Sequence, residues 1–280
     1  MTRIGIIGFG MVGKAIEFGF GLTHEVKIYD PKYPELDTIK DVVETSDYIF
    51  VSVPTPMKKN GEINLKTLSA VIDNLAKTIP ITRHPVIIIK STIIPGTTRR
   101  YQQKYSYLKF VFNPEFLTER NHKLDFINTA RIILGGEKEI VNKIEKEVYR
   151  PRFEHTPIFK TDWETAEFVK YMCNTFFANK VIFMNVIRKA VDKFNESNLG
   201  ANIDWDMAVK CFLADQRIGN SHYQVPGHDG DFGFGGTCFP KDLNAFIWWL
   251  KDQGLKDEAN YFKSVWKLNL KYRKNKDWEK

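Results

Sequence analysis

Residues 3–13, RIGIIGFGMVG, contain the motif that decides the fold. The apolar run from Arg3 to Gly8 predicts a strand, and the glycines that follow predict a turn that opens a helix. The first glycine allows the tight turn, the second lets the backbone approach a pyrophosphate, and the third lets helix and strand pack closely. The order strand, turn, helix predicts a dinucleotide site at Gly8, Phe9, Gly10, Met11, Val12 and Gly13.

An acidic residue ends the next predicted strand, Glu25 to Asp30, about 20 residues after Gly8. A carboxylate at this place accepts hydrogen bonds from both ribose hydroxyls and repels a ribose phosphate, so Asp30 favours NAD over NADP. Lys32 lies close by and weakens that preference. A turn whose glycines serve packing alone is the alternative. We expect NAD as the cofactor.

Apolar runs alternate with helical patterns through the first half of the chain. Further strands are expected over 48–53, 85–92, 108–113 and 131–134, with a helix near 65–79. Short β-rich runs separated by helices are typical of parallel βαβ units with both sheet faces covered. We therefore predict an α/β fold class, with a Rossmann-type doubly wound parallel sheet over residues 1–157.

The second half has a helical pattern. Thr161 and Glu164 have capping-box spacing, and the stretch after them contains neither Gly nor Pro up to about Asn195. This predicts one long central helix in an all-helical domain over residues 158–280, which also carries the cysteine loop. Further helices are expected over 204–215, 241–253 and 257–271.

The composition is that of a soluble globular chain: 280 residues, 43% apolar and 27% charged. No stretch has the about 18 apolar residues of a membrane span. The net charge of +7 suits phosphate-bearing small molecules as well as nucleic acid, but no nucleic-acid motif occurs. Three cysteines (Cys173, Cys211, Cys238) are too few and odd in number for a disulfide framework, which favours the cytoplasm. No metal site is expected.

Residues 232–242, FGFGGTCFPKD, form the second informative segment. Its glycines free the backbone to wrap a ligand, and Cys238 stands where a helix begins. A helix N-terminus and Lys241 both favour the thiolate over the thiol. Asp242, one helical turn on, is suited to take a proton or orient a water. The alternative is a buried apolar cysteine, which we assign to Cys173 and Cys211.

Lys170 and Asn174 lie four residues apart in the long predicted helix, so they share a face. A lysine among apolar neighbours is partly desolvated, and its ammonium can stabilise an oxyanion with Asn174 as a neutral donor. The alternative is a surface lysine whose ammonium reaches solvent, beside an asparagine on the helix face.

These residues resemble the UDP-glucose and GDP-mannose dehydrogenases, in register over nearly the whole chain. The motifs that carry the resemblance are Gly8–Gly13, Val53-Pro54-Thr55, Lys90-Ser91-Thr92, Asn113–Leu117 with Glu119, Lys170–Asn174, Gln216–Asn220 and Gly233–Asp242. The last block is the most specific of them.

The resemblance implies a four-electron oxidation. In that family the primary alcohol of a nucleotide sugar becomes a carboxylate through a cysteine thiohemiacetal and thioester, with two NAD consumed. UDP-glucose oxidised to UDP-glucuronate is the expected reaction, serving polysaccharide biosynthesis. The implied roles are nucleophile for Cys238, oxyanion partner for Lys170 with Asn174, water and proton handling for Asp242, thioester hydrolysis for Glu115, and water binding for Thr92.

The resemblance also implies binding residues. Cofactor contacts beyond the turn are expected at Asp30, Lys32, Val53, Thr55, Thr92, Glu119 and Lys241. Substrate contacts are expected at Phe116, Leu117, Glu119, Lys170, Asn174, Arg217, Tyr223, Phe234 and Gly235. Arg217 matches an arginine that reaches the substrate of a neighbouring subunit, which implies a homodimer built on the long helix. Neither nucleic acid nor a membrane is an expected partner.

Two departures from the family pattern bear on the substrate. Full-length members carry a third domain that helps grip the nucleotide, and this chain ends at Lys280, so a short form is expected. The loop over 221–231 is longer than usual. One alternative function is a single-hydride hydroxyacid dehydrogenase of the hydroxyisobutyrate or 6-phosphogluconate type, against which Cys238 argues. Another is a non-catalytic NAD-binding protein, against which the retained polar groups argue.

Overall fold

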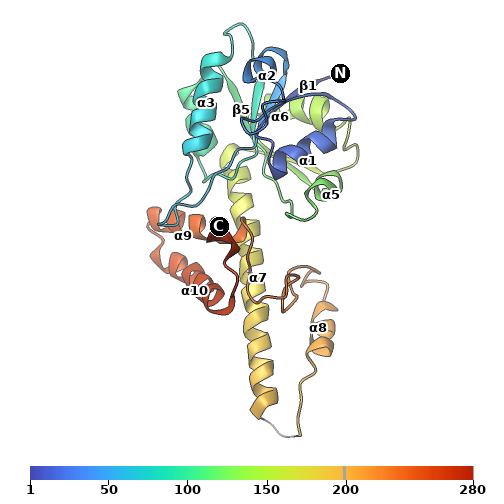
Figure 1. Cartoon of the computed structure of the whole chain (residues 1–280), viewed down its shortest axis with the longest axis vertical. Coiled ribbons are helices and arrows are strands. Elements are labelled where there is room, and N and C mark those ends of the chain that lie inside the picture. The colour runs from blue at the N-terminus through green and yellow to red at the C-terminus, as the bar shows by residue number, and fades with distance from the viewer. Residues whose placement is uncertain (198–199, 280) are drawn as a thin grey trace. The chain divides into compact units, whose positions relative to one another are not determined.

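The computed structural model describes residues 1–197 and 200–279, and the chain divides into two compact units. The first unit comprises Met1–Lys58 and Ile63–Lys170, and the second comprises Lys59–Glu62 and Tyr171–Lys280. A short piece of the second unit is therefore inserted in the sequence of the first. Figure 1 shows the course of the chain through both units.

The first unit is built on a seven-stranded sheet with the order β2-β1-β3-β4-β5-β6-β7. The strands are β1 (Arg3–Ile7), β2 (Glu25–Tyr29), β3 (Tyr48–Val51), β4 (Val86–Ile89), β5 (Lys109–Phe112), β6 (Ile132–Gly135) and β7 (Ile158–Thr161). The first five strands pair in parallel, as the sequence predicts. The expectation of a parallel sheet is wrong at β6, which pairs antiparallel with β5 through Phe112 and Gly135.

Helices cover both faces of this sheet. They are α1 (Met11–Phe20), α2 (Ile39–Thr45), α3 (Lys66–Thr78), α4 (Thr97–Lys104), α5 (His122–Ile127) and α6 (Lys138–Ile144), with a π-helical turn η1 (Glu145–Tyr149). Alternate residues of a strand enter opposite cores: Ile49 packs with α2 and α3, and Phe50 packs with α1 and α5. Each fully buried side chain of this kind contributes about 1.5–3 kcal/mol. The doubly wound fold is confirmed.

The predicted capping box at the start of the long helix is wrong. Thr161 belongs to β7, and α7 (Trp163–Ser197) begins two residues later. The cap is Asp162, whose carboxylate accepts the backbone N–H of Thr165 at 2.8 Å. Glu164 pairs instead with Arg99, at 2.5 Å. Pairing of β7 with β6 uses the backbone of Thr161, so the cap moves one residue along the chain.

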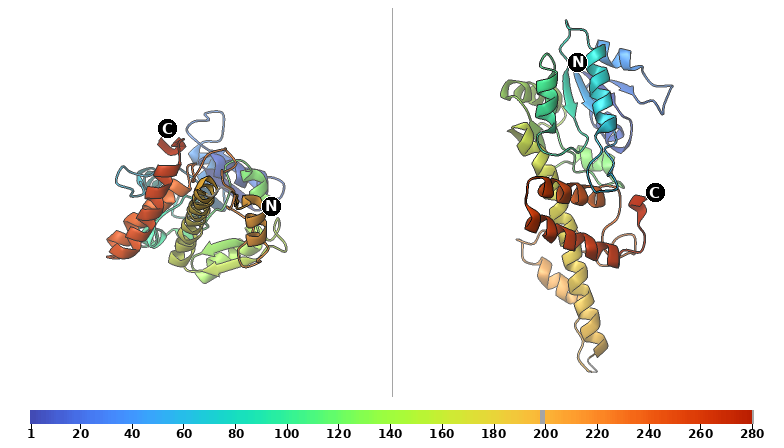
Figure 2. Two further views of the ribbon diagram at one scale, coloured as in Figure 1. Left: turned by 90° about the horizontal axis from the view of Figure 1, so that it is seen from below. Right: turned by 90° about the vertical axis from the view of Figure 1, so that its left-hand side faces the viewer.

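The second unit is helical, as expected. The helical domain expected over residues 158–280 differs at its start, because β7 at 158–161 pairs into the sheet of the first unit. The second unit contains the part of α7 from Tyr171 onward, α8 (Trp205–Leu213), α9 (Phe239–Asp252), α10 (Lys256–Tyr272) and a 3-10 turn η2 (Asp277–Glu279). The helices α9 and α10 pack side by side (Figure 2). The inserted segment joins this unit through Gly61, where an added Cβ would lie 3.4 Å from the carbonyl oxygen of Asn244. Within 1–197 and 200–279, no helix has the length and hydropathy needed to cross a bilayer.

Candidate active site

The glycine turn of the first unit tolerates no side chain at two of its three glycines. Gly8 has a φ of +95°, and an added Cβ would lie 2.8 Å from the carbonyl oxygen of Ser52. At Gly13 an added Cβ would lie 2.1 Å from the carbonyl oxygen of Gly8. At Gly10 it would meet nothing within 4 Å. The first and third glycines thus serve local packing, and the second leaves open space above the turn.

The residues around that space fit a dinucleotide. Gly10 is the N-cap of α1 and has no side chain to cover the amides of the first turn, which also lacks acidic residues. These amides and the positive end of the helix favour a pyrophosphate. Asp30, just beyond β2, accepts the backbone N–H of Phe9 at 2.7 Å and that of Lys32 at 2.9 Å. Each carboxylate oxygen keeps a lone pair that can accept a ribose hydroxyl.

Further predicted cofactor residues meet at the carboxyl ends of β3 and β4. The hydroxyl of Thr55 donates to the carbonyl oxygen of Thr92 at 2.9 Å, and that of Ser91 donates to the carbonyl oxygen of Val53 at 2.7 Å. Thr55 and Thr92 are both buried. Since ligands of open α/β sheets bind at this edge, the structure brings Val53, Thr55 and Thr92 to the expected place in the first unit.

A buried ion pair lies after β5. The ammonium of Lys170 donates to the carboxylate of Glu115 at 2.8 Å and to the carbonyl oxygen of the same residue at 2.5 Å. The two side chains are 3% and 7% exposed. The alternative of a surface lysine is therefore wrong for Lys170. Removing one member of such a pair leaves an uncompensated buried charge, which destabilises a fold strongly.

This pair fixes the charge of Glu115. Burial by itself raises the pKa of the carboxyl, but the charge and hydrogen bond of Lys170 outweigh it and hold the pKa below its usual value. The backbone N–H of Leu117 also donates to this carboxylate, at 2.8 Å. Glu115 is consequently an ionised hydrogen-bond acceptor inside the first unit.

The structure adds Lys90 to the same cluster, which sequence reasoning did not select. Its ammonium donates to the side-chain oxygen of Asn113 at 2.8 Å, and the hydroxyl of Tyr149 donates to the same oxygen at 2.5 Å. Burial, opposed by Glu115 and assisted by Lys170, lowers the pKa of Lys90 to about 7. The available signal was a lysine directly after four apolar residues of a strand.

A small cavity of about 30 Å³ lies within this cluster, which is room for one or two waters. Its polar lining includes Lys90, Asn113, Glu115 and Arg131. Phe116 also lines it, with its ring 4.4 Å from the Arg131 guanidinium and 5.4 Å from the Lys170 ammonium. The lining further includes Leu117, whereas Glu119 is exposed. The predicted segment after β5 is therefore split between a buried and an exposed part.

In the second unit, Cys238 is the N-cap of α9, with Pro240 in the first turn. Its carbonyl oxygen accepts the backbone N–H of Asp242 at 2.8 Å, which closes that turn. Its sulfur lies 3.9 Å from the hydroxyl of Thr237. All three cysteines fall in the described residues and none of them forms a disulfide. The assignment of Cys173 and Cys211 as buried is wrong, since Cys173 is half-buried and Cys211 is exposed. The expected position of Cys238 at a helix start is confirmed.

A second buried charge lies one turn into α9. Asp242 is fully buried and accepts the side-chain amide of Asn174 at 2.6 Å. Its other oxygen accepts the ammonium of Lys241. A buried carboxylate requires such partners to offset its desolvation. The structure thus joins Asn174, Lys241 and Asp242, all of which the sequence selected, into one polar group of the second unit.

The remaining predicted substrate residues of the second unit are dispersed. Arg217 is exposed and pairs with Asp215 two residues away. Tyr223 is half-buried, whereas Phe234 is buried edge-on against Phe239, with ring centroids 6.1 Å apart. Gly235 lies against a buried arginine, Arg273, which was not among the predicted residues.

This chain is similar to known dehydrogenases in sequence and in fold. The model of the UDP-glucose/GDP-mannose dehydrogenase family, NAD binding domain, matches residues 32–153, and the model of that family's central domain matches residues 164–271. The UDP-glucose 6-dehydrogenase TuaD of Bacillus subtilis is 33% identical over 82% of this chain and 48% of its own length. The uncharacterized protein MJ1054 of Methanocaldococcus jannaschii is 36% identical over 82% of this chain and 24% of its own length.

Among solved structures, a UDP-glucose dehydrogenase from the hyperthermophilic archaeon Pyrobaculum islandicum matches with a TM-score of 0.81 and 26% identity, over 96% of this chain and 68% of that one. The chain spans half or less of the length of these two curated relatives. Since the first model describes an NAD binding domain, the expectation of NAD as the cofactor is confirmed. The two models together match most of the sequence, and the chain belongs to the UDP-glucose/GDP-mannose dehydrogenase family.

Proposed function

We propose that this chain catalyses the NAD-dependent four-electron oxidation of a nucleotide sugar's primary alcohol to the carboxylate, with UDP-glucose as the first candidate. The observation that carries the proposal is Cys238 at the start of α9, one turn before the buried group of Asn174, Lys241 and Asp242. The relatives named UDP-glucose 6-dehydrogenase support the choice of substrate.

In this proposal Cys238 carries the substrate carbon between the two oxidations. The alcohol first loses two electrons and becomes an aldehyde. The thiolate adds to that aldehyde and forms a C–S bond, giving a thiohemiacetal whose loss of two more electrons gives a thioester. Water then breaks the C–S bond, releasing the carboxylate and restoring the thiol. A thiolate suits these steps because it is both a soft nucleophile and a good leaving group.

The surrounding polar groups handle charge and protons. Lys170 stabilises the oxyanion that forms when the thiolate or water attacks, and Asn174 adds a neutral donor. Glu115, held ionised by Lys170, takes the proton of the hydrolytic water, which Thr92 orients. Asp242, fixed by Asn174 and Lys241, receives a proton in exchange with the reacting oxygen.

The glycine turn and Asp30 hold the cofactor in this scheme. Bound NAD supplies the hydride acceptor for both oxidations. Glu119 and Lys241 complete the proposed cofactor contacts, together with Val53 and Thr55. The proposed substrate contacts are Phe116, Leu117, Glu119, Lys170, Asn174, Arg217, Tyr223, Phe234 and Gly235.

The deciding experiment counts NADH per molecule of product. The full chain is incubated with NAD and UDP-glucose, and NADH absorbance and product mass are followed together. Two NADH per carboxylate support the proposal. One NADH per oxidised substrate supports the hydroxyacid dehydrogenase alternative, and NAD binding without any turnover of a nucleotide-sugar panel supports a non-catalytic protein.

A cysteine pair of variants sharpens the result. Cys238→Ser is expected to lose carboxylate formation by about 1,000-fold or more, because a serine hydroxyl is not ionised near neutral pH and an alkoxide leaves poorly. Cys211→Ser is the matched control, since Cys211 is exposed on α8. Carboxylate formation at the wild-type rate in Cys238→Ser would exclude the thioester route.

We further propose that α7 mediates a homodimer. Within the second unit α7 exposes large apolar side chains at helical spacing, including Met172 (60% exposed), Phe176 (59%) and Phe183 (48%). A stripe of this kind on a soluble helix favours burial against a partner of the same shape. The measurement is molar mass by light scattering, with Phe176→Glu expected to give monomer. Wild-type protein that is monomeric at tens of micromolar contradicts the dimer.

A further inference from the structure

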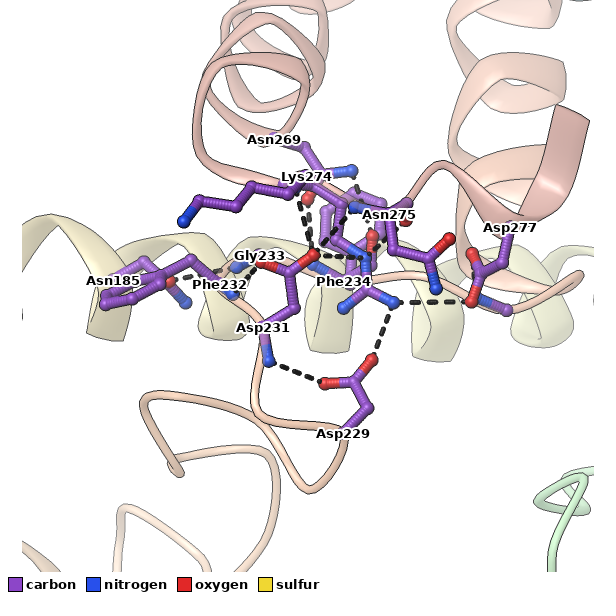
Figure 3. Close-up of polar contacts among 12 residues, drawn as sticks. Asn185, Asp229, Asp231, Phe232, Gly233, Phe234, Asn269, Lys274, Asn275 and Asp277 are labelled. Atoms are coloured by element: carbon purple, nitrogen blue, oxygen red, sulfur yellow. Dashed lines mark hydrogen bonds and ion pairs between the residues drawn. The ribbon is translucent and has the colours of Figure 1, made fainter.

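A buried arginine just after α10 plays no part in the chemistry above. Arg273 is 4% exposed, and its guanidinium pairs with Asp229 at 2.6 Å, Asp277 at 3.3 Å and Asp231 at 3.6 Å. Figure 3 shows these three carboxylates converging from two segments of the second unit, the loop before Cys238 and the tail after α10. One desolvated cation thus holds two segments that are about 45 residues apart in sequence.

Backbone groups reinforce this junction in both directions. The carboxylate of Asp231 accepts the backbone N–H groups of Lys274 at 2.9 Å and Asn275 at 2.8 Å. The carboxylate of Asp277 accepts the backbone N–H of Gly236 at 3.0 Å. A carboxylate of each segment thus accepts backbone N–H groups of the other. Gly236 lies two residues before Cys238.

Two buried asparagines hold the middle of the same loop. Asn269 of α10 accepts the backbone N–H of Phe234 at 2.7 Å and donates to its carbonyl oxygen at 3.0 Å. Asn185 of α7 accepts the backbone N–H of Gly233 at 2.9 Å. Both asparagines are 1% exposed or less. Hydrogen bonds of this kind replace the sheet or helix partners that an irregular backbone lacks.

Two glycines of the loop lie too close to polar side chains of the second unit to carry a Cβ of their own. An added Cβ at Gly235 would lie 2.3 Å from a guanidinium nitrogen of Arg273. An added Cβ at Gly233, whose φ is +68°, would lie 2.3 Å from the side-chain oxygen of Asn269. Glycine is required at both positions by the approach of a polar side chain, in addition to any ligand.

We propose that Asn269, Arg273 and Asp277, here called the tail clamp, are positioning residues for the Cys238 sulfur. The tail clamp fixes the backbone from Gly233 to Gly236, and this backbone leads directly into the N-cap of α9. For its effect on catalysis the proposal rests on the function proposed above, because an error of about 1 Å in a reacting atom costs on the order of 100-fold in rate.

The test removes the guanidinium by Arg273→Met in the full chain. The rate of Cys238 alkylation by iodoacetamide is measured by mass spectrometry relative to that of Cys211, which is exposed in the same unit. We expect the ratio of the two rates to change severalfold and kcat with UDP-glucose to fall about 100-fold, while the Kd of NAD stays constant. Arg273→Lys, which keeps the charge, should recover part of both effects.

Lys193→Met is the matched control, since Lys193 forms an exposed ion pair with Glu196 in the same unit. It should leave the alkylation ratio and kcat unchanged. If Arg273→Met fails to fold, Asp277→Asn decides in its place, with the same readouts and a smaller expected change.

The proposal is overturned if either the alkylation ratio or kcat of the folded variant equals that of the wild type. A wild-type chain that does not oxidise any nucleotide sugar refutes the proposed function instead. In that case the alkylation ratio alone decides whether the tail clamp sets the environment of the Cys238 sulfur, so the two failures are distinguishable.

Discussion

The glycine turn of the first unit and the cysteine loop of the second are both rich in glycine, yet their glycines meet different neighbours. In the turn, a Cβ at Gly8 or Gly13 would strike backbone carbonyls, one of them five residues away in the same motif. In the loop, a Cβ at Gly233 or Gly235 would strike the side chains of Asn269 and Arg273.

This difference separates two ways of building a site. A turn whose constraints are backbone contacts is specified largely by its own short motif, and a helix N-terminus supplies the binding groups. A loop held by distant side chains depends on residues that no local pattern connects to it. A substitution within the turn should therefore disrupt it by a steric clash. The loop should be disrupted by substitution of a side chain that is distant in sequence.

The largest expected effect is at Gly13. Gly13→Ala places a Cβ 2.1 Å from the carbonyl oxygen of Gly8, so the turn must open and NAD affinity should fall about 1,000-fold, or about 4 kcal/mol. Gly10→Ala meets nothing within 4 Å in the protein and should weaken NAD binding while leaving the melting temperature unchanged. Calorimetric titration and thermal melting measure the two quantities.

Equal losses of NAD affinity with equal losses of melting temperature in the two variants would show that both glycines serve packing. That result would remove the distinction between the packing glycine and the ligand-facing glycine of the turn.

Asn269→Ala tests the other kind of site. Two buried hydrogen bonds to Phe234 are lost and its backbone groups are left unsatisfied, so the unfolding free energy should fall by about 3 kcal/mol. Because the change lies in the second unit, the Kd of NAD should not move. Denaturant unfolding and NAD titration are the measurements. A weakened NAD affinity would contradict the claim that the cysteine loop and the glycine turn act independently.

Lys90 gives an effect of intermediate size that depends on pH. Burial lowers its pKa from 10.5 to about 7, so folding releases a proton from this lysine between those values. The corresponding stability is fully present above the unfolded pKa and is lost as the pH falls toward about 7. Relative to Lys90→Met, the wild type should therefore lose about 2 kcal/mol between about pH 9 and about pH 7.

The measurement is urea unfolding across that pH range. Lys104→Met is the control, because Lys104 is an exposed partner of Asp73 in the same unit. Parallel stability curves for wild type and Lys90→Met would show that Lys90 titrates normally despite its burial.

The smallest predicted effect is at Asp30. Asp30→Asn keeps the shape of the side chain but removes the charge that repels a ribose phosphate and weakens the hydrogen bonds to ribose. NAD affinity should fall about tenfold, which is about 1.4 kcal/mol, and the ratio of NADP to NAD affinity should rise. An unchanged ratio in titrations with both cofactors would show that Lys32 or another group decides the preference.

Sequence reasoning succeeded where a pattern is local. The strands of 48–53 and 85–92 and the helices of the second unit were predicted because apolar periodicity needs no partner to be recognised. The capping box failed because Thr161 has a better partner in β6 than in its own helix. The antiparallel pairing of β6 was not predicted for the same reason, because the direction of a strand depends on the neighbouring strand with which it pairs.

The candidate site divides along the same line. Cys238, Lys170 and Asp242 could be chosen because each lies in a motif with chemical meaning. Lys90 and Arg273 could not, because a lysine or arginine acquires a role from burial and from the partners that the fold supplies. The spacing of residues in the sequence shows neither the burial of a side chain nor its partners in the fold.

The insertion of Lys59–Glu62 in the second unit has a consequence for how the polypeptide is made. These residues leave the ribosome more than 100 residues before α7 is complete, yet Gly61 packs against Asn244. The chain between Gly61 and Asn244 is long, so the contact has a large closure entropy and is expected to form late in folding. A fragment that begins at Tyr171 therefore lacks a piece of its own unit.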